Sequence, residues 1–282
     1  MKIRGGKIIG TKLIISRALA KLELQHTKYL SNLSIWDQYI VFVYTLGSQP
    51  VNRRLVGVPV TPKLANRWTF ELFKNYQYGI KNIGRPFKKM AEYFINPNKF
   101  IYLSESLKNE ITEEALELYT QNLQRIIMQA PVTSGNITVY KASTPYDEKL
   151  LQNSGFPFLL PQPPFNSTSF DPNFDFNAFL GSNSDTCCLW KITIPKGSHV
   201  LAIAHPFQAY LTEREVLLPI GSIFEVTGFK NVQLSYWNKR EAPIKVQHSP
   251  YYIGEIYQHD NWESRSQSVR SVRMLNAIFH NS

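Results

Sequence analysis

Residues 186–226, TCCLWKITIPKGSHVLAIAHPFQAYLTEREVLLPIGSIFEV, combine strand, loop and strand patterns. The run from Cys188 to Ile194 is rich in β-branched and aromatic residues and ends at the turn sequence Pro-Lys-Gly-Ser. A second apolar run follows at 200–204, and a third from Val216 to Leu218 ends before Pro219. This pattern predicts a β-rich body around the segment.

Two carboxylates, Glu213 and Glu215, stand at the mouth of the third apolar run. Residues i and i+2 of a strand lie on one face, so both side chains are predicted to point the same way. The loop before them carries Phe207 and Tyr210. An isolated Glu-x-Glu is most often a solvated strand start, so a functional interpretation needs further partners.

Two upstream segments supply such partners. Residues 137–143, ITVYKAS, predict a strand that ends in a cation, Lys141, and small residues. Residues 165–170, FNSTSF, predict a short strand with three consecutive hydroxyls, at Ser167, Thr168 and Ser169.

A basic strand end, Ser-Thr-Ser and Glu-x-Glu, in that order, resemble the R-S-E class of arginine-specific ADP-ribosyltransferases. The run E-x-E-V-L-L-P-x-G extends the resemblance, and Tyr44-Thr45 followed by Asn52-x-x-Leu55 look like a helical signature of the same family. The resemblance covers roughly residues 30–230. It implies an α+β fold in which an N-terminal helical part packs on a split β-sandwich that holds an NAD cleft.

The resemblance also implies roles in cleaving NAD, which serves as substrate. Glu215 would bind the hydroxyl of the nicotinamide ribose and stabilise positive charge developing on that sugar. Ser167 would hold the Glu215 carboxylate in place. Glu213 would steer an arginine acceptor, whose guanidinium is always protonated. Tyr210 would contribute to recognition of the target protein.

The remaining NAD contacts implied by the resemblance are Lys141, Ala142, Thr168 and Ser169, beside Ser167 and Glu215 themselves. Lys141 departs from the family pattern, which has arginine there. Lysine keeps the charge but loses the planar fork. The backbone of Ala142 would bond the nicotinamide amide. Six histidines are scattered without metal-ligand spacing, so no metal is expected.

Charge is unevenly distributed along the 282 residues. Residues 1–106 hold 17 basic and 5 acidic side chains, a net +12, whereas residues 107–282 have a net charge of −2. A basic N-terminal half suits either a solvated face or an acidic or nucleic-acid partner.

The compartment is predicted from three features. The two cysteines are adjacent, Cys187 and Cys188, so no disulfide framework is expected. No apolar run approaches the ~20 residues of a membrane span. Lys12 and Arg17 interrupt any signal-peptide core. We expect a cytoplasmic protein, in a host cytosol or a virion if it comes from a pathogen.

The chain divides into three predicted parts: a basic arm at 1–30, a transferase domain at 31–258, and a C-terminal tail at 259–282. The domain comprises a helical part, 31–130, and a β core, 131–258. Its longest predicted helix covers 112–130 with Thr112 as cap. Residues 144–165 are predicted to be a connector. The tail has the spacing of a short amphipathic helix, with Val269, Val272, Leu275 and Ile278 aligned.

Two alternatives to protein ADP-ribosylation remain open at this point. NAD hydrolysis, with water as acceptor, needs Glu215 but not Glu213. A nucleic-acid or virion-binding protein on a decayed transferase fold would explain both Lys141 and the basic N-terminal half. The intact Ser-Thr-Ser and Glu-x-Glu motifs argue against that second alternative.

Overall fold

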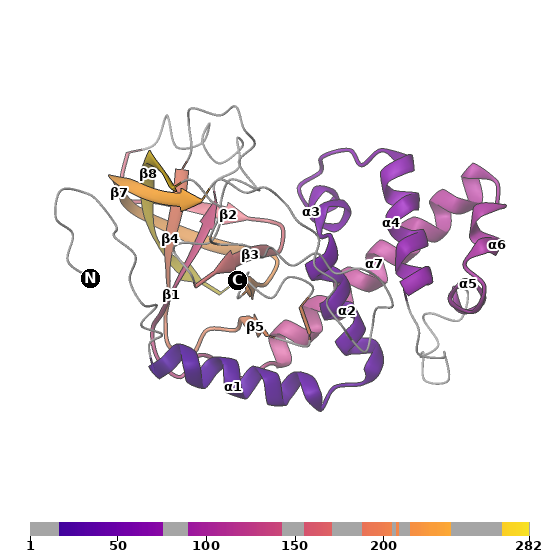
Figure 1. Cartoon of the computed structure of the whole chain (residues 1–282), viewed down its shortest axis with the longest axis horizontal. Helices are drawn as coiled ribbons and strands as arrows, with labels where there is room; N and C mark the ends of the chain where they lie inside the picture. Colours follow the sequence, from indigo (N-terminus) through magenta and orange to yellow (C-terminus); the bar gives the residue numbers. More distant parts are fainter. Residues whose placement is uncertain are drawn as a thin grey trace.

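The computed structural model describes residues 17–75, 90–142, 155–170, 188–204, 207–208, 215–237 and 267–281. Helices precede strands along the chain, and the predicted α+β fold is confirmed (Figure 1). The helices are α1 Arg17–Ser31, α2 Ile35–Leu46, α3 Gln49–Leu55, α4 Pro62–Asn75, α5 Ala91–Ile95, α6 Asn98–Ile101 and α7 Glu105–Gln129. The strands are β1 Ile137–Ala142, β2 Phe158–Gln162, β3 Asn166–Ser169, β4 Cys188–Ile194, β5 Leu201–Ile203, β6 Glu215–Leu218, β7 Ser222–Trp237 and β8 Gln267–His280.

The strands form one eight-stranded sheet in the order β2-β7-β8-β4-β1-β3-β6-β5. Its pairs are antiparallel except for β4 with β8. Residues from both ends of this order share one apolar cluster, including Leu160 of β2, Phe224 of β7 and Val216 of β6. The sheet therefore bends over itself and buries one face as a sandwich interior.

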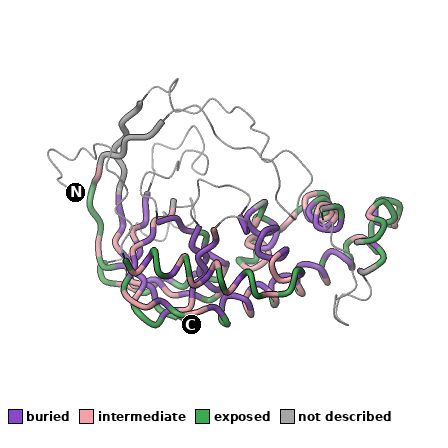
Figure 2. Tube along the Cα trace, turned by 60° about the horizontal axis from the view of Figure 1, so that its bottom comes forward, coloured by how far each residue is buried: buried purple, intermediate pink, exposed green. Residues whose placement is uncertain are grey.

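The opposite face of β5 and β6 packs on the helices. Leu201, Ile203 and Leu217 belong to a second cluster with α2 and α7 residues such as Ile40 and Leu123. Alternation along the strands explains the division, because Ala202 and Val216 face the sandwich interior instead. Figure 2 shows buried residues in the strands and the inner helical turns, and exposed ones on the outer turns.

Helix α1 corrects the expected N-terminal arm, since residues 17–30 belong to the folded body. Leu19, Leu22, His26 and Leu30 recur at helical spacing and are buried. His26 donates from Nε2 to the Pro131 carbonyl at 2.7 Å and accepts the Ala202 N–H at Nδ1, at 2.8 Å. The imidazole thereby fastens α1 to strand β5 and to the segment that follows α7.

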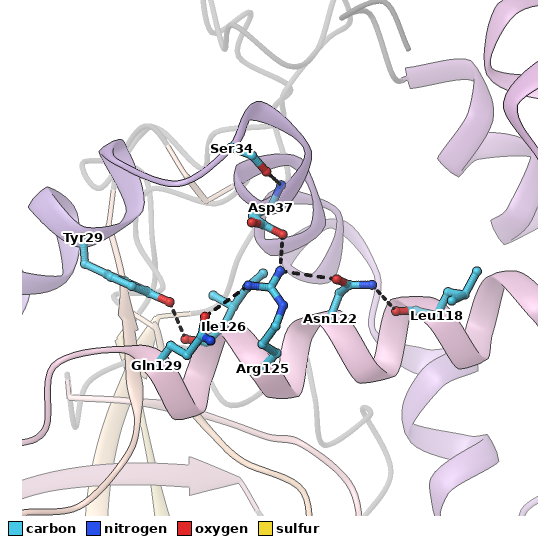
Figure 3. A network of polar contacts seen from close by, with 8 residues as sticks. All are labelled: Tyr29, Ser34, Asp37, Leu118, Asn122, Arg125, Ile126 and Gln129. Atoms are coloured by element: carbon cyan, nitrogen blue, oxygen red, sulfur yellow. Dashed lines mark hydrogen bonds and ion pairs between the residues drawn. The ribbon is translucent and has the colours of Figure 1, made fainter. Parts of the chain in front are cut away.

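Helix α7 is the axis on which the helical part assembles. Arg125 pairs with Asp37 of α2 at 2.5 Å, and the Tyr29 hydroxyl of α1 donates to the Ile126 carbonyl at 2.9 Å (Figure 3). The Ser34 hydroxyl accepts the Asp37 N–H and caps α2. Three helices are thus tied together at one point of α7.

The start of α7 differs from the prediction. The helix begins at Glu105, where the Ser104 hydroxyl accepts the Leu107 N–H at 3.3 Å. Thr112 is not a cap: it lies buried within the helix, and its hydroxyl donates to Asn66 Oδ1 of α4 at 2.9 Å. The earlier cap was missed because the two turns after Ser104 are mostly polar, so the apolar period starts later.

The C-terminal residues also differ from the prediction. Residues 267–280, expected as a tail with helical spacing, form strand β8 in the interior of the sheet. β8 runs parallel to β4 and antiparallel to the 16-residue β7. Leu275, Ala277 and Phe279 alternate into the sandwich core, so the period of two prevails over the helical one.

Strand β2 is a third difference, because it lies inside the expected connector. Pairing with β7 from Phe158↔Val226 to Gln162↔Ser222 supplies the backbone partners that local sequence did not reveal. The strands predicted at 244–246 and 251–257 lie outside the described residues. The helix predicted at 87–94 lies only partly within them, as α5.

Candidate functional site

Strands β1, β3 and β6 are neighbours, and their register aligns the predicted site residues. Tyr140 pairs with Ser169, and Ser169 pairs with Glu215. Directly paired residues point to the same face. Tyr140, Ser169 and Glu215 therefore face the helical core, together with Ser167 two residues before Ser169.

Glu215 begins β6 and is 3% exposed. Burial raises the pKa of its carboxyl group to about 7, while a hydrogen bond from the Ser167 side chain acts to lower it. Among the residues that the structure describes, its Oε2 atom has no hydrogen-bond partner. The site thus holds one buried carboxylate, oriented by a hydroxyl, with one acceptor atom unoccupied by protein.

Two helical residues complete the surroundings of Glu215. Asn52 of α3 donates from Nδ2 to the Tyr44 hydroxyl of α2 at 3.0 Å. Burial, and then the charge of Glu215, raise the pKa of Tyr44. The Tyr44 ring meets Phe165, the residue before β3, edge-on with centroids 5.8 Å apart. Both residues of the helical signature therefore lie beside the carboxylate, although the sequence assigned them no role.

Tyr119 is a neighbour that the sequence did not indicate. Its hydroxyl donates to the Ile40 carbonyl at 2.6 Å, and the charge of Glu215 contributes to the raised pKa of its buried phenol, after burial itself and the nearby Tyr44 and Tyr39. It occupies an apolar position of α7, so its spacing predicted only a core residue.

Lys141 lies on the other face of the sheet. It pairs with Trp190, whose side chain belongs to the sandwich core. Its ammonium donates to Asn166 Oδ1 at 2.6 Å and to Gln162 Oε1 at 3.5 Å. It therefore reaches the Ser-Thr-Ser strand through Asn166, the residue directly before Ser167.

The other predicted NAD contacts are distributed over the same strands. The Thr168 hydroxyl donates to the Val216 carbonyl at 2.6 Å and faces the sandwich interior. Ser169 is buried opposite Glu215. Ala142 ends β1 and pairs with Leu189. Glu213 and Tyr210 lie outside the described residues.

Within the described ranges, no group of three histidine, cysteine or acidic side chains is arranged to hold a metal ion. None of the helices in those ranges is long and apolar enough to cross a membrane.

The arrangement of strands and site residues corresponds to a class of enzyme, the ADP-ribosyltransferases. The family model of ADP-ribosyltransferase exoenzymes matches residues 23–248, and the chain belongs to this family. The resemblance found in the sequence is thereby confirmed.

Solved structures agree on the fold. Plx2a, an ADP-ribosyltransferase toxin from Paenibacillus larvae, superposes with a TM-score of 0.51 at 13% identity, over 94% of this chain and 96% of the toxin. C3stau2 from S. aureus, solved with NAD, gives a TM-score of 0.47 at 16% identity over 97% and 98% of the two chains. The Salmonella SpvB domain gives 0.48 at 14%, over 88% and 100%. A search of curated proteins finds no significant match.

Proposed function

We propose that this chain is a mono-ADP-ribosyltransferase that transfers ADP-ribose from NAD to an arginine of a protein acceptor. Family membership supports an NAD-dependent transferase, and such an enzyme implies a protein acceptor. Nothing in the family match or the neighbours points to a nucleic-acid partner. The arginine acceptor rests on the Glu-x-Glu sequence at 213–215.

The observation that carries the proposal is the buried Glu215 carboxylate with its unpartnered Oε2. A buried acceptor without a donor is costly, and a ribose hydroxyl would supply that donor. The carboxylate would then lie beside the sugar carbon that becomes cationic. Ser167 fixes its orientation through the hydrogen bond described above.

In the proposed reaction, the bond between ribose C1′ and the nicotinamide nitrogen breaks, and its electron pair leaves on nicotinamide. The ionised Glu215 stabilises the positive charge that develops on the ribose. An arginine guanidinium nitrogen forms the new bond to C1′ and releases a proton. Glu213 would orient that guanidinium through a charge-assisted hydrogen bond.

The direct test uses NAD labelled in its adenine half, incubated with the protein and a cell lysate. The proposal expects labelled protein, free nicotinamide, and competition by a small guanidino compound. Glu215→Gln should abolish both label and nicotinamide release. Glu213→Gln should abolish label but spare release of nicotinamide to water. Equal loss of both activities in Glu213→Gln would contradict the division of roles between the two carboxylates.

The second candidate, NAD hydrolysis, is favoured by one observation: Glu215 and Ser167 are assembled without any contribution from Glu213. Free ADP-ribose formed at the same rate with and without acceptor protein, and no labelled protein, would select this function instead.

A further inference from the structure

We infer that Lys141 is a positioning residue, which holds the Ser167–Glu215 pair in place through Asn166, and that it does not bind the NAD phosphates. The inference rests on the proposed function for its kinetic consequences. Its structural part concerns a polar cluster inside the sandwich, formed by Lys141, Asn166 and Gln162, which we call the amide bracket.

The first step is the demand of two buried amides. Asn166 and Gln162 are 1% and 4% exposed, and each presents its side-chain oxygen to the Lys141 ammonium. A buried amide oxygen that loses its donor costs free energy, so the ammonium is held where these oxygens converge. Its three rotatable donors suit two separate acceptors better than the planar fork of arginine does.

The second step is the rigid link from Asn166 to the site. Its Nδ2 atom donates to the Pro164 carbonyl at 3.0 Å while its Oδ1 atom accepts from Lys141, so both ends of the amide are fixed. Asn166 is joined by one peptide bond to Ser167, whose side chain bonds Glu215. Three consecutive links therefore connect the ammonium to the carboxylate.

The third step is the direction in which Lys141 points. The register places Tyr140 in line with Ser169 and Glu215, so Lys141 lies on the sandwich face with Asn166. The bracket also joins strands that are not sheet neighbours, since Gln162 belongs to β2 at the far edge. Lys141 thereby fastens the bend of the sheet at the point where β3 carries Ser167.

The kinetic test compares Asn166→Leu with Asn166→Asp, two substitutions of similar size. Asn166→Leu removes the acceptor, and we expect kcat for nicotinamide release to fall about tenfold to a hundredfold, since small misplacements of reacting groups cost that much. The KM for NAD should change less than about twofold, because no group that contacts NAD is lost. Asn166→Asp keeps an acceptor and should retain most of kcat.

The pH profile of kcat supplies a readout that general loss of stability does not move. Loosening Ser167 removes the bond that lowers the Glu215 pKa, so the acid limb of Asn166→Leu and Lys141→Met should shift to higher pH. The double variant should be no slower than the slower single variant, as expected for one shared path. A rise in KM with unchanged kcat in Lys141→Met, unaffected by Asn166→Leu, would overturn the inference and identify a phosphate contact.

A protein that does not turn over NAD would refute the proposed function without deciding this point, so equilibrium unfolding provides an independent measurement. The double-mutant cycle of Lys141→Met and Asn166→Leu should show coupling of about tenfold in the unfolding constant. Full additivity would mean that the two side chains do not act together, and would overturn the bracket itself.

Discussion

Replacing Glu215 by glutamine should stabilise the protein at alkaline pH. Burial raises the carboxyl pKa from 4.5 to about 7, so the folded state binds a proton that the unfolded chain releases across that window. Stability is therefore lost as pH rises from about 4.5 to about 7, because the fold must then hold a buried charge. The shift corresponds to about 3 kcal/mol, which Glu215→Gln should recover at pH 8.

The assay is urea unfolding of both proteins at pH 5 and pH 8, in parallel with NAD turnover. At pH 5 the native carboxyl group is largely protonated, so the two midpoints should nearly coincide. At pH 8 the variant should be more stable and inactive. Glu110→Gln, a change at an exposed position of α7, is the matched control and should show neither effect. A stability difference that is the same at both pH values would refute the argument from burial.

Three further predictions concern other parts of the molecule. Burial lowers the pKa of His26, whose two nitrogens already have partners, so stability should fall as pH drops below about 6.5; His26→Gln should flatten this dependence in urea midpoints, and an unchanged slope would contradict it. Tyr44→Phe leaves the Asn52 amide without its acceptor and should cost about 1–2 kcal/mol of unfolding free energy and reduce NAD turnover, whereas wild-type values for both would argue against the link between helices and site. Deleting residues 267–282 removes an interior strand and should abolish cooperative unfolding seen by circular dichroism, whereas a truly peripheral tail could be removed without effect.

Local patterns predicted those elements whose surroundings the sequence could anticipate. β1, β3, β4 and β6 were found because short β-branched runs stand next to turn residues and motif residues. The capped helix α2 was found in the same way. Thr112 misled the prediction because its hydroxyl bonds a distant residue, Asn66, and not its own helix terminus.

The site shows the same division between local and distant information. The pairing of Ser167 with Glu215 was inferred from the order of motifs. The contacts of Lys141 could not be inferred, because its partners lie 25 and 21 residues further along the chain, in strands whose proximity depends on the bend of the sheet. Tyr119 was hidden for a similar reason, since a tyrosine on an apolar helix face predicts only packing.

The sequence by itself determined the family, the α+β class and the acids and hydroxyls of the site, because these depend on residue types and on their order along the chain. Only the tertiary structure decided that residues 267–280 form an interior strand, that α1 closes the sandwich, and that Lys141 faces two amides. The physical reason is that each of these outcomes is set by partners far away in sequence. A strand without its neighbours, or an ammonium without its acceptors, carries no local signal of where it will bind.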